Sequence, residues 1–277
     1  MKKISRRSFL AAAAVSVAAL AMTACGGSAS SAASSVASSA ASSEAVSYAA
    51  AELTTVETGK LTMATNATFP PYEMTTDSGE LEGIDVDTAK AIAEKLGLEL
   101  QIDDMDFDAA LLSVQQGKAD IVMAGVTVTD ERKAVMDFSD SYATGIQSII
   151  VPNDSDIASP DDLAGKKIGT QRGTTGYIYC SDDFGEDSVV AYDSGLTAVQ
   201  ALNNGQVDAV VIDNAPATEY VAANPGLKVL DTSYAEEDYA IGMATGSALE
   251  DAVNKALEEL KADGTLQAIV DKYINAN

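Results

Sequence analysis

Arg132 is the residue of this chain best suited, by type and position, to hold a carboxylate. Its guanidinium presents N–H donors in a planar fork that matches the two oxygens of a carboxylate. Earlier in the same stretch, Gly125 would allow close approach to the backbone, and Thr127 adds a hydroxyl group. A helix predicted to begin at Thr129 or Asp130 would add free N–H groups and the positive end of its dipole. The alternative is that Arg132 pairs with an acidic side chain on the surface.

Asp213 supplies a charge of the opposite sign. It follows the apolar stretch 209–212, which is typical of a buried strand, so its carboxylate is placed to take an ammonium group. A free amino acid carries a carboxylate and an ammonium on the same carbon, and a site for it needs one partner for each. The alternative for Asp213 is the N-cap of the helix that follows.

Composition excludes several other kinds of site. The chain of 277 residues has no histidine, which excludes imidazole-based metal sites and any catalytic triad that uses histidine. We expect no metal and no cofactor. Because 42 acidic residues face 17 basic ones, the net charge of −25 repels nucleic acid and anionic lipid headgroups. Cys180 is expected to be a plain small residue and not a reactive thiol.

The first 25 residues are typical of an export signal that ends at a cysteine. The apolar run 9–20 follows a basic start and is too short to span a bilayer core of about 30 Å. The sequence Met-Thr-Ala-Cys ending at Cys25 resembles a bacterial lipobox, so we expect lipidation of Cys25, for example by palmitate. An ordinary cleaved signal with an incidental cysteine is the alternative. Residues 5–10 also resemble a twin-arginine signal, which leaves the export route open.

Residues 26–56 predict a disordered tether. Serine and alanine dominate this segment, and it has too few bulky apolar side chains to offset the entropy of ordering. A lipid at Cys25 followed by a flexible tether would hold a folded body at the cell membrane, on its extracytoplasmic side, and let it reorient. Contact with the membrane would then be through the N-terminal lipid only, and the body is expected to be a monomer.

Strand and helix patterns alternate in two successive series after the tether. The first predicts strands at 61–65, 98–102 and 121–124 and helices at 87–96 and 109–116. The second predicts strands at 167–170, 189–192 and 209–212 and helices at 175–181 and 196–203, and an amphipathic helix follows at 247–263. Two such series indicate an α/β fold with two lobes, each a mostly parallel sheet flanked by helices. Ligands of such sheets bind beyond the carboxyl ends of the strands, so the informative loops are 66–72, 125–132, 171–176 and 213–214.

Four separate motifs in this order resemble one family, the polar amino-acid class of bacterial extracellular solute-binding proteins. They lie at 64–73, 83–87, 119–142 and 161–166. The resemblance covers about residues 57–275. It implies a type II periplasmic-binding-protein fold whose lobes are joined by two crossing hinge strands. Lobe 1 would comprise 57–146 plus 240–277, and lobe 2 would comprise 147–239.

The resemblance also implies roles for individual residues. Arg132 would hold the α-carboxylate of an amino acid, helped by Thr127 and by N–H groups around Thr127 and Thr174, and Asp213 would hold the α-ammonium. The remaining contacts would be an aromatic sandwich from Phe69 and Phe107 and side-chain recognition by Asn66, Gln171 and Thr175. Core packing is the alternative for both phenylalanines, and a turn is the alternative for Asn66. Asp85 and Asp87 match the family but are expected to be turn and cap residues.

The side chain of the ligand is predicted from the residues that would read it. Binders of basic amino acids in this family tend to carry Asp at the position of Asn66, and Gln171 stands where the similar glutamine binder has Lys. These two amides favour a polar, uncharged side chain. Arg172 would admit an acidic ligand if it pointed inward.

The resulting hypothesis is a non-enzymatic binding component of an ABC import system, which passes a free amino acid to a membrane permease. One alternative is an exported enzyme on the same fold, such as a cyclohexadienyl dehydratase or a murein-cleaving enzyme. Such an enzyme needs a proton donor in the cleft, and without histidine this would be Asp, Glu or Tyr. The other alternative is a ligand sensor that signals to a receptor.

Overall fold

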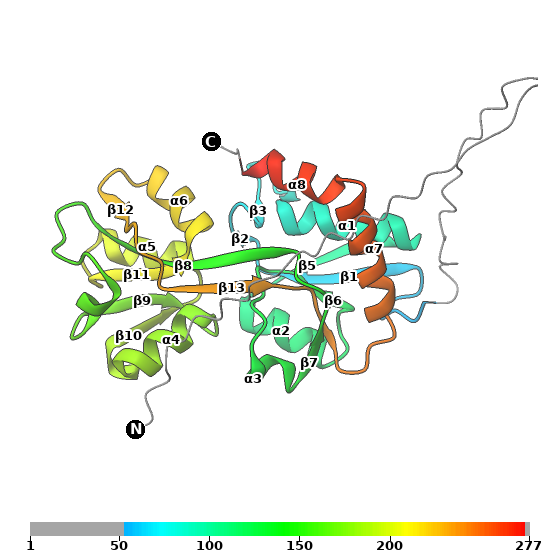
Figure 1. Ribbon diagram of the computed structural model, residues 1–277, viewed down its shortest axis with the longest axis horizontal. Helices are drawn as coiled ribbons and strands as arrows, with labels where there is room; N and C mark the ends of the chain where they lie inside the picture. Colours follow the sequence, from blue (N-terminus) through cyan, green and yellow to red (C-terminus); the bar gives the residue numbers. More distant parts are fainter. Residues whose placement is uncertain (1–52, 275–277) are drawn as a thin grey trace, which may run out of the picture. The chain divides into compact units, whose positions relative to one another are not determined.

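Two β-sheets flanked by helices organise residues 53–274, which are the residues that the computed structural model describes (Figure 1). The predicted signal peptide 1–25, its Cys25 and the tether up to residue 52 lie outside the described residues. Within the described range, no helix is long and apolar enough to cross a membrane.

The first sheet has the strand order β5-β1-β6-β14-β7. Its strands are β1 (Lys60–Thr65), β5 (Glu99–Asp104), β6 (Ile121–Val122), β7 (Met136–Phe138) and β14 (Gly242–Ala244). The helices of this lobe are α1 (Ile84–Leu96), α2 (Phe107–Gln115), α3 (Asp130–Lys133), α7 (Glu250–Ala262) and α8 (Thr265–Tyr273). A small antiparallel sheet lies beside them and consists of β2 (Thr68–Phe69), β3 (Glu73–Thr75) and β4 (Leu81–Glu82).

The second sheet has the order β10-β9-β11-β8-β12, and β13 also pairs with β8. Its strands are β8 (Ala143–Pro152), β9 (Ile168–Gln171), β10 (Val189–Tyr192), β11 (Ala209–Asp213), β12 (Leu227–Val229) and β13 (Ala235–Tyr239). Its helices are α4 (Thr175–Phe184), α5 (Gly195–Asn203) and α6 (Asn214–Ala222), with short 3-10 turns at η2 (Pro160–Leu163) and η3 (Glu186–Ser188).

The prediction of mostly parallel sheets holds only for the core of each sheet. The trios β5-β1-β6 and β10-β9-β11 are parallel, whereas β14, β8, β12 and β13 join by antiparallel pairing. The reason is the route of the chain between the lobes. It leaves the first lobe along β8 and returns along β13, and these two long strands lie side by side between the sheets (Figure 1).

Helix α1 begins earlier than the predicted 87, and Gly83 explains why. Gly83 has φ +136°, and a Cβ on it would lie 2.2 Å from the carbonyl oxygen of Tyr72, so only glycine fits this entry turn. Asp85 therefore lies inside the first turn of α1 and is fully buried. Its carboxylate accepts hydrogen bonds from Tyr142 Oη (2.7 Å) and Gly125 N (2.9 Å), so the predicted turn role is wrong and Asp85 instead fixes the loop at Gly125.

Asp87 is not a cap either. It lies in the first turn of α1 and accepts from Lys272 Nζ at 2.7 Å, which links α1 to α8. The predicted amphipathic face of α7 is confirmed, because its apolar residues are all buried: Leu249, Val253, Ala256, Leu257 and Leu260. Cys180 is buried as well, and burial raises the pKa of its thiol to about 12, which keeps it unreactive.

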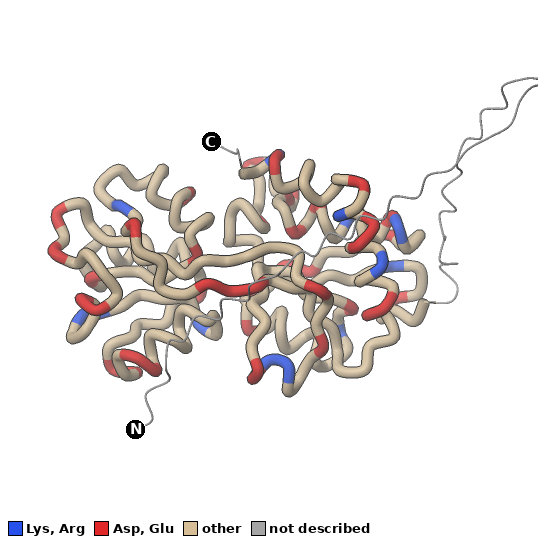
Figure 2. Tube along the Cα trace, in the orientation of Figure 1, with Lys and Arg blue, Asp and Glu red and all other residues tan. Residues whose placement is uncertain are grey.

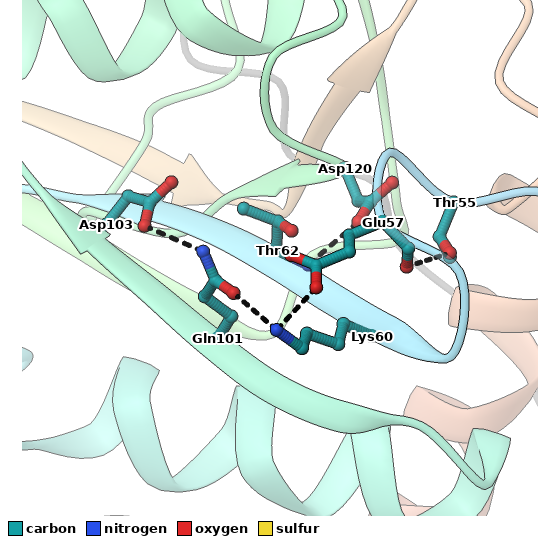
Figure 3. Close-up of polar contacts among 7 residues, drawn as sticks. All are labelled: Thr55, Glu57, Lys60, Thr62, Gln101, Asp103 and Asp120. Carbon is teal, nitrogen blue, oxygen red and sulfur yellow. Dashed lines mark hydrogen bonds and ion pairs between the residues drawn. The ribbon is translucent and has the colours of Figure 1, made fainter.

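The first described residues are attached to the first sheet (Figure 3). The carboxylate of Asp120 accepts from Val56 N and from Thr62 N, both at 2.7 Å, and Leu53 packs against the core. Lys60 pairs with Glu57 at 2.6 Å beside them. The chain just before residue 57 thus already contacts the lobe that follows it.

Candidate functional site

A cavity lies where the carboxyl ends of strands from both sheets meet. All ten residues that the sequence predicts as ligand contacts line it. The lining of this cavity is Asn66, Phe69, Glu73, Phe107, Ala124, Gly125, Thr127, Arg132, Gln171, Thr174, Thr175 and Asp213. The structure therefore brings the predicted site residues together around one space and adds two that were not among the predicted ligand contacts, Glu73 and Ala124.

Arg132 is held at this cavity by backbone carbonyls. Helix α3 is short and is capped by Thr129, whose hydroxyl oxygen accepts from Arg132 N at 3.2 Å. The guanidinium donates to Thr127 O (2.8 Å) and Gly173 O (3.2 Å), and it lies 5.4 Å from the centroid of the Phe107 ring. Burial lowers its pKa. Among the described residues Arg132 forms no ion pair, so the alternative that it pairs with a surface acid is wrong. The positive charge of Arg132 therefore lies at the cavity without a bonded counter-ion among these residues.

Asp213 ends strand β11 and occupies the N-cap position of α6 without a capping hydrogen bond from its side chain. Its carboxylate instead accepts from Gln147 Nε2 at 2.8 Å and from the hydroxyl of Tyr239. Burial, followed by the charge of Glu237, raises the pKa of Asp213 to about 7. Of the two predicted roles, the structure supports a side chain turned toward the cavity.

Gly125 leaves the space that the ring of Phe69 occupies, and Phe107 reaches the cavity separately. Gly125 has φ +55°, and a Cβ on it would meet the Phe69 ring at 2.7 Å. Phe69 also stacks on Tyr72, with centroids 5.8 Å apart. Phe69 and Phe107 are both buried in apolar clusters and line the cavity, so core packing and ligand contact are compatible for these two residues.

Asn66 and Gln171 meet across the two lobes. Gln171 Nε2 donates to Asn66 Oδ1 at 2.8 Å, and Asn66 Nδ2 donates to Met105 O at 2.9 Å. Arg172 does not line the cavity. Its side chain is exposed and lies 3.6 Å from Asp193, so it gives no inward charge for an acidic ligand.

The second lobe contributes its donors from the start of α4. Thr174 is the N-cap of this helix, and its hydroxyl oxygen accepts from Tyr177 N at 3.3 Å. Thr175 donates from Oγ1 to Glu237 Oε2 at 3.0 Å. Both threonines lie where a helix N-terminus faces the cavity, which favours an anionic group there.

Glu237 is a functional candidate that the sequence did not reveal. It lies on β13, within the acidic run 236–238 between the lobes (Figure 2), and such a run is typical of a solvated strand. Its Oε2 accepts from Thr127 Oγ1 (3.2 Å), Gln147 Nε2 (2.9 Å) and Thr175 Oγ1 (3.0 Å). The sequence signal for its burial was the two-residue spacing between Glu237 and the aromatic Tyr239, because alternate residues of a strand lie on the same face.

Comparison with known proteins gives a consistent result. The family described as bacterial extracellular solute-binding proteins, family 3, matches residues 61–276. The L-cystine-binding protein of Escherichia coli K12 is 33% identical over 225 residues, which cover 80% of this chain and 85% of that protein. The crystal structure of the arginine-, lysine- and histidine-binding protein of Geobacillus stearothermophilus matches with a TM-score of 0.76 at 34% identity, covering 79% of this chain and 96% of that one.

An ancestral arginine-binding protein, solved with arginine bound, matches with a TM-score of 0.75 at 44% identity. The match covers 78% of this chain and 99% of the ancestral protein. The fold class predicted from sequence, a two-lobed type II periplasmic-binding-protein fold, is confirmed by these structures. The chain belongs to family 3 of the bacterial extracellular solute-binding proteins.

Proposed function

We propose that this chain binds one free amino acid between its two lobes and delivers it to the permease of an ABC importer. The observation that carries the proposal is a pair of opposite charges, Arg132 and Asp213, in the lining of one cavity. The two groups come from different lobes, so an amino acid that contacts both would hold the lobes together. Relatives named for binding cystine and arginine support the same class of ligand.

In this proposal Arg132 takes the α-carboxylate, with the hydroxyl of Thr127 and the α4 N-terminus at Thr174 as further donors. Asp213 takes the α-ammonium. Phe69 and Phe107 would cover the aliphatic part of the ligand, and Gly125 leaves room for Phe69. Gln171, Asn66 and Thr175 would contact the rest of the ligand. The support for these roles is that each of these side chains lines the cavity.

We further propose that the chain acts as a monomeric binding protein and not as an enzyme, with lobe boundaries at 146/147 and 239/240. The support for these boundaries is that the first lies within β8 and the second at the end of β13, and these two strands pair with each other. Its relatives are solute-binding proteins by name.

Isothermal titration of the purified chain with each of the twenty amino acids tests the function. We expect at least one to bind with one site per chain and a dissociation constant near micromolar, which corresponds to about −8 kcal/mol. The released amino acid should be recovered chemically unchanged. Affinities no tighter than about millimolar for all twenty would overturn the proposal.

We also propose that Cys25 is lipidated and that residues 26–52, which precede the segment attached to the lobe, form a tether on the extracytoplasmic side of the membrane. The support is the lipobox-like sequence and the serine- and alanine-rich segment after it. Replacing Cys25 with serine is expected to move the protein from the membrane fraction to the soluble fraction of expressing bacteria. Cys180→Ser is the matched control, because that thiol is buried and should leave membrane association unchanged. A Cys25→Ser protein that stays in the membrane fraction would contradict the anchor.

A further inference from the structure

Glu73 is the one carboxyl group of the cavity lining that no side chain or backbone group satisfies. It is fully buried, lies on β3 and lines the cavity. Neither of its carboxyl oxygens has a hydrogen-bond partner among the described residues. Buried carboxyl groups are normally paired or hydrogen-bonded, so two free oxygens beside a cavity indicate a partner that enters from the cavity.

Glu73 has no partner in the proposed binding of the ligand's α-carboxylate and α-ammonium. The carboxylate of the ligand binds Arg132, the one cation of the described lining, and the ammonium of the ligand binds Asp213. The amides of Asn66 and Gln171 are bonded to each other at 2.8 Å. Of the charged groups in the lining, Glu73 alone therefore remains for the side chain of the ligand.

The surroundings of Glu73 are negative from several directions. The carboxylates that act on it are Asp85 on α1, Asp213 at the end of β11 and Asp104 on β5. Asp85 accepts hydrogen bonds from Tyr142 Oη and Gly125 N, and its negative charge acts on Glu73. Three nearby tyrosines have pKa values raised by burial and also by the charge of Glu73, namely Tyr72, Tyr142 and Tyr220.

We propose that Glu73 binds the distal end of the ligand's side chain and that this end is a cation rich in N–H donors, a guanidinium or an ammonium. The inference rests on the proposed amino-acid binding and deepens it. A neutral amide would satisfy one oxygen but leave the excess negative charge of Glu73 and Asp85 uncompensated, whereas a cation supplies both donors and charge. The uncharged side chain predicted from Asn66 and Gln171 is thereby replaced, because these two residues hold each other.

Binding of such a cation has a consequence for protons. Burial, and next the charge of Asp85, raises the pKa of Glu73 well above its usual value, which favours the protonated form of the group in the ligand-free protein. A cation on its oxygens favours the carboxylate. The O–H bond of Glu73 then breaks on binding, the proton passes to the buffer, and the positive charge of the ligand takes its place.

Titration of the full chain with L-arginine and with L-citrulline, its uncharged isostere, tests this inference. We expect wild type to bind arginine at least tenfold more tightly than citrulline. Glu73→Gln should weaken arginine binding by roughly 30-fold or more and leave citrulline within about threefold. Repeating the arginine titration in two buffers of different ionisation enthalpy should show proton release in wild type and less release in Glu73→Gln.

Glu82→Gln is the matched control. Glu82 lies on the neighbouring strand β4, is only half-buried and does not line the cavity, so its replacement should alter neither affinity. Thermal unfolding verifies that each variant is folded, and the wild-type comparison of arginine with citrulline needs no variant.

Equal affinities of wild type for arginine and citrulline, or equal losses for both in Glu73→Gln, would overturn the assignment of Glu73. Amino-acid binding itself would survive either result. Failure of wild type to bind any amino acid would instead refute the proposed function, and the inference with it.

Discussion

Replacing Arg132 with alanine is expected to lower amino-acid affinity by a factor of roughly 150 to 5000, which moves the dissociation constant of a micromolar site to about 0.1 mM or weaker. The substitution would leave the ligand carboxylate buried without a cation, and removing one member of a buried charge pair costs about 3 to 5 kcal/mol. Isothermal titration with the preferred amino acid measures the loss directly.

The fold should survive this change. Arg132 donates to two backbone carbonyls, those of Thr127 and Gly173, and an intramolecular hydrogen bond contributes about 1 kcal/mol to stability. Arg172→Ala is the control, because this arginine is exposed and pairs with Asp193 away from the cavity, so its affinity should equal that of wild type. An Arg132→Ala protein that unfolds near the wild-type temperature and binds within threefold of wild type would place the carboxylate site elsewhere.

The parts of the fold that the sequence predicted are those set by local patterns. An apolar run predicts strand β1, and apolar residues spaced three and four apart predict helix α7. Both elements lie within three residues of their expected ends. The loops after β1, β6, β9 and β11 were also predicted, since parallel strands place their carboxyl ends at one edge of a sheet. This is why nine of the ten predicted contacts meet at one cavity, and the tenth, Phe107, reaches it from the start of α2 after β5.

The parts that were missed depend on contacts between distant segments. The start of α1 is set by the approach of Gly83 to the backbone of Tyr72, which no local propensity reports. The antiparallel pairings arise from β8 and β13, whose direction is fixed only when the chain crosses between lobes and returns.

The missed acidic residues share one cause. Glu73 ends the loop motif 64–73, and Glu237 lies in an acidic run typical of a solvated strand, yet both side chains are buried. Burial of a carboxyl is a property of the assembled lobes and not of the neighbouring residues in sequence. The bond between Asn66 and Gln171 was hidden for the same reason, because its partners come from different lobes.

Asp213→Asn is expected to weaken amino-acid binding by roughly 10- to 100-fold at neutral pH. The ammonium of the ligand would lose its counter-charge, and charge-assisted hydrogen bonds are about twice as strong as neutral ones. The asparagine is close in size and keeps one oxygen for Tyr239 or Gln147, so the loss should reflect charge and not a collapsed site.

The same substitution should flatten the pH dependence of binding. The pKa of Asp213 is raised to about 7 in the ligand-free protein, and the ammonium binds the carboxylate form. Affinity of wild type should therefore fall as pH drops below about 7, by up to tenfold per pH unit, and level off above it. A neutral amino acid such as L-glutamine, titrated between pH 5 and 8, isolates this effect from that of Glu73.

Asp231→Asn is the control for both measurements, since Asp231 is exposed in the loop between β12 and β13 and outside the cavity lining. Its affinity and pH profile should match those of wild type. If the pH profiles of Asp213→Asn and wild type run parallel from pH 5 to 8, the titrating group is not Asp213. The ammonium of the ligand must then find its counter-charge in another carboxylate. Glu237 is the next candidate, because it is buried and its charge raises the pKa of Asp213.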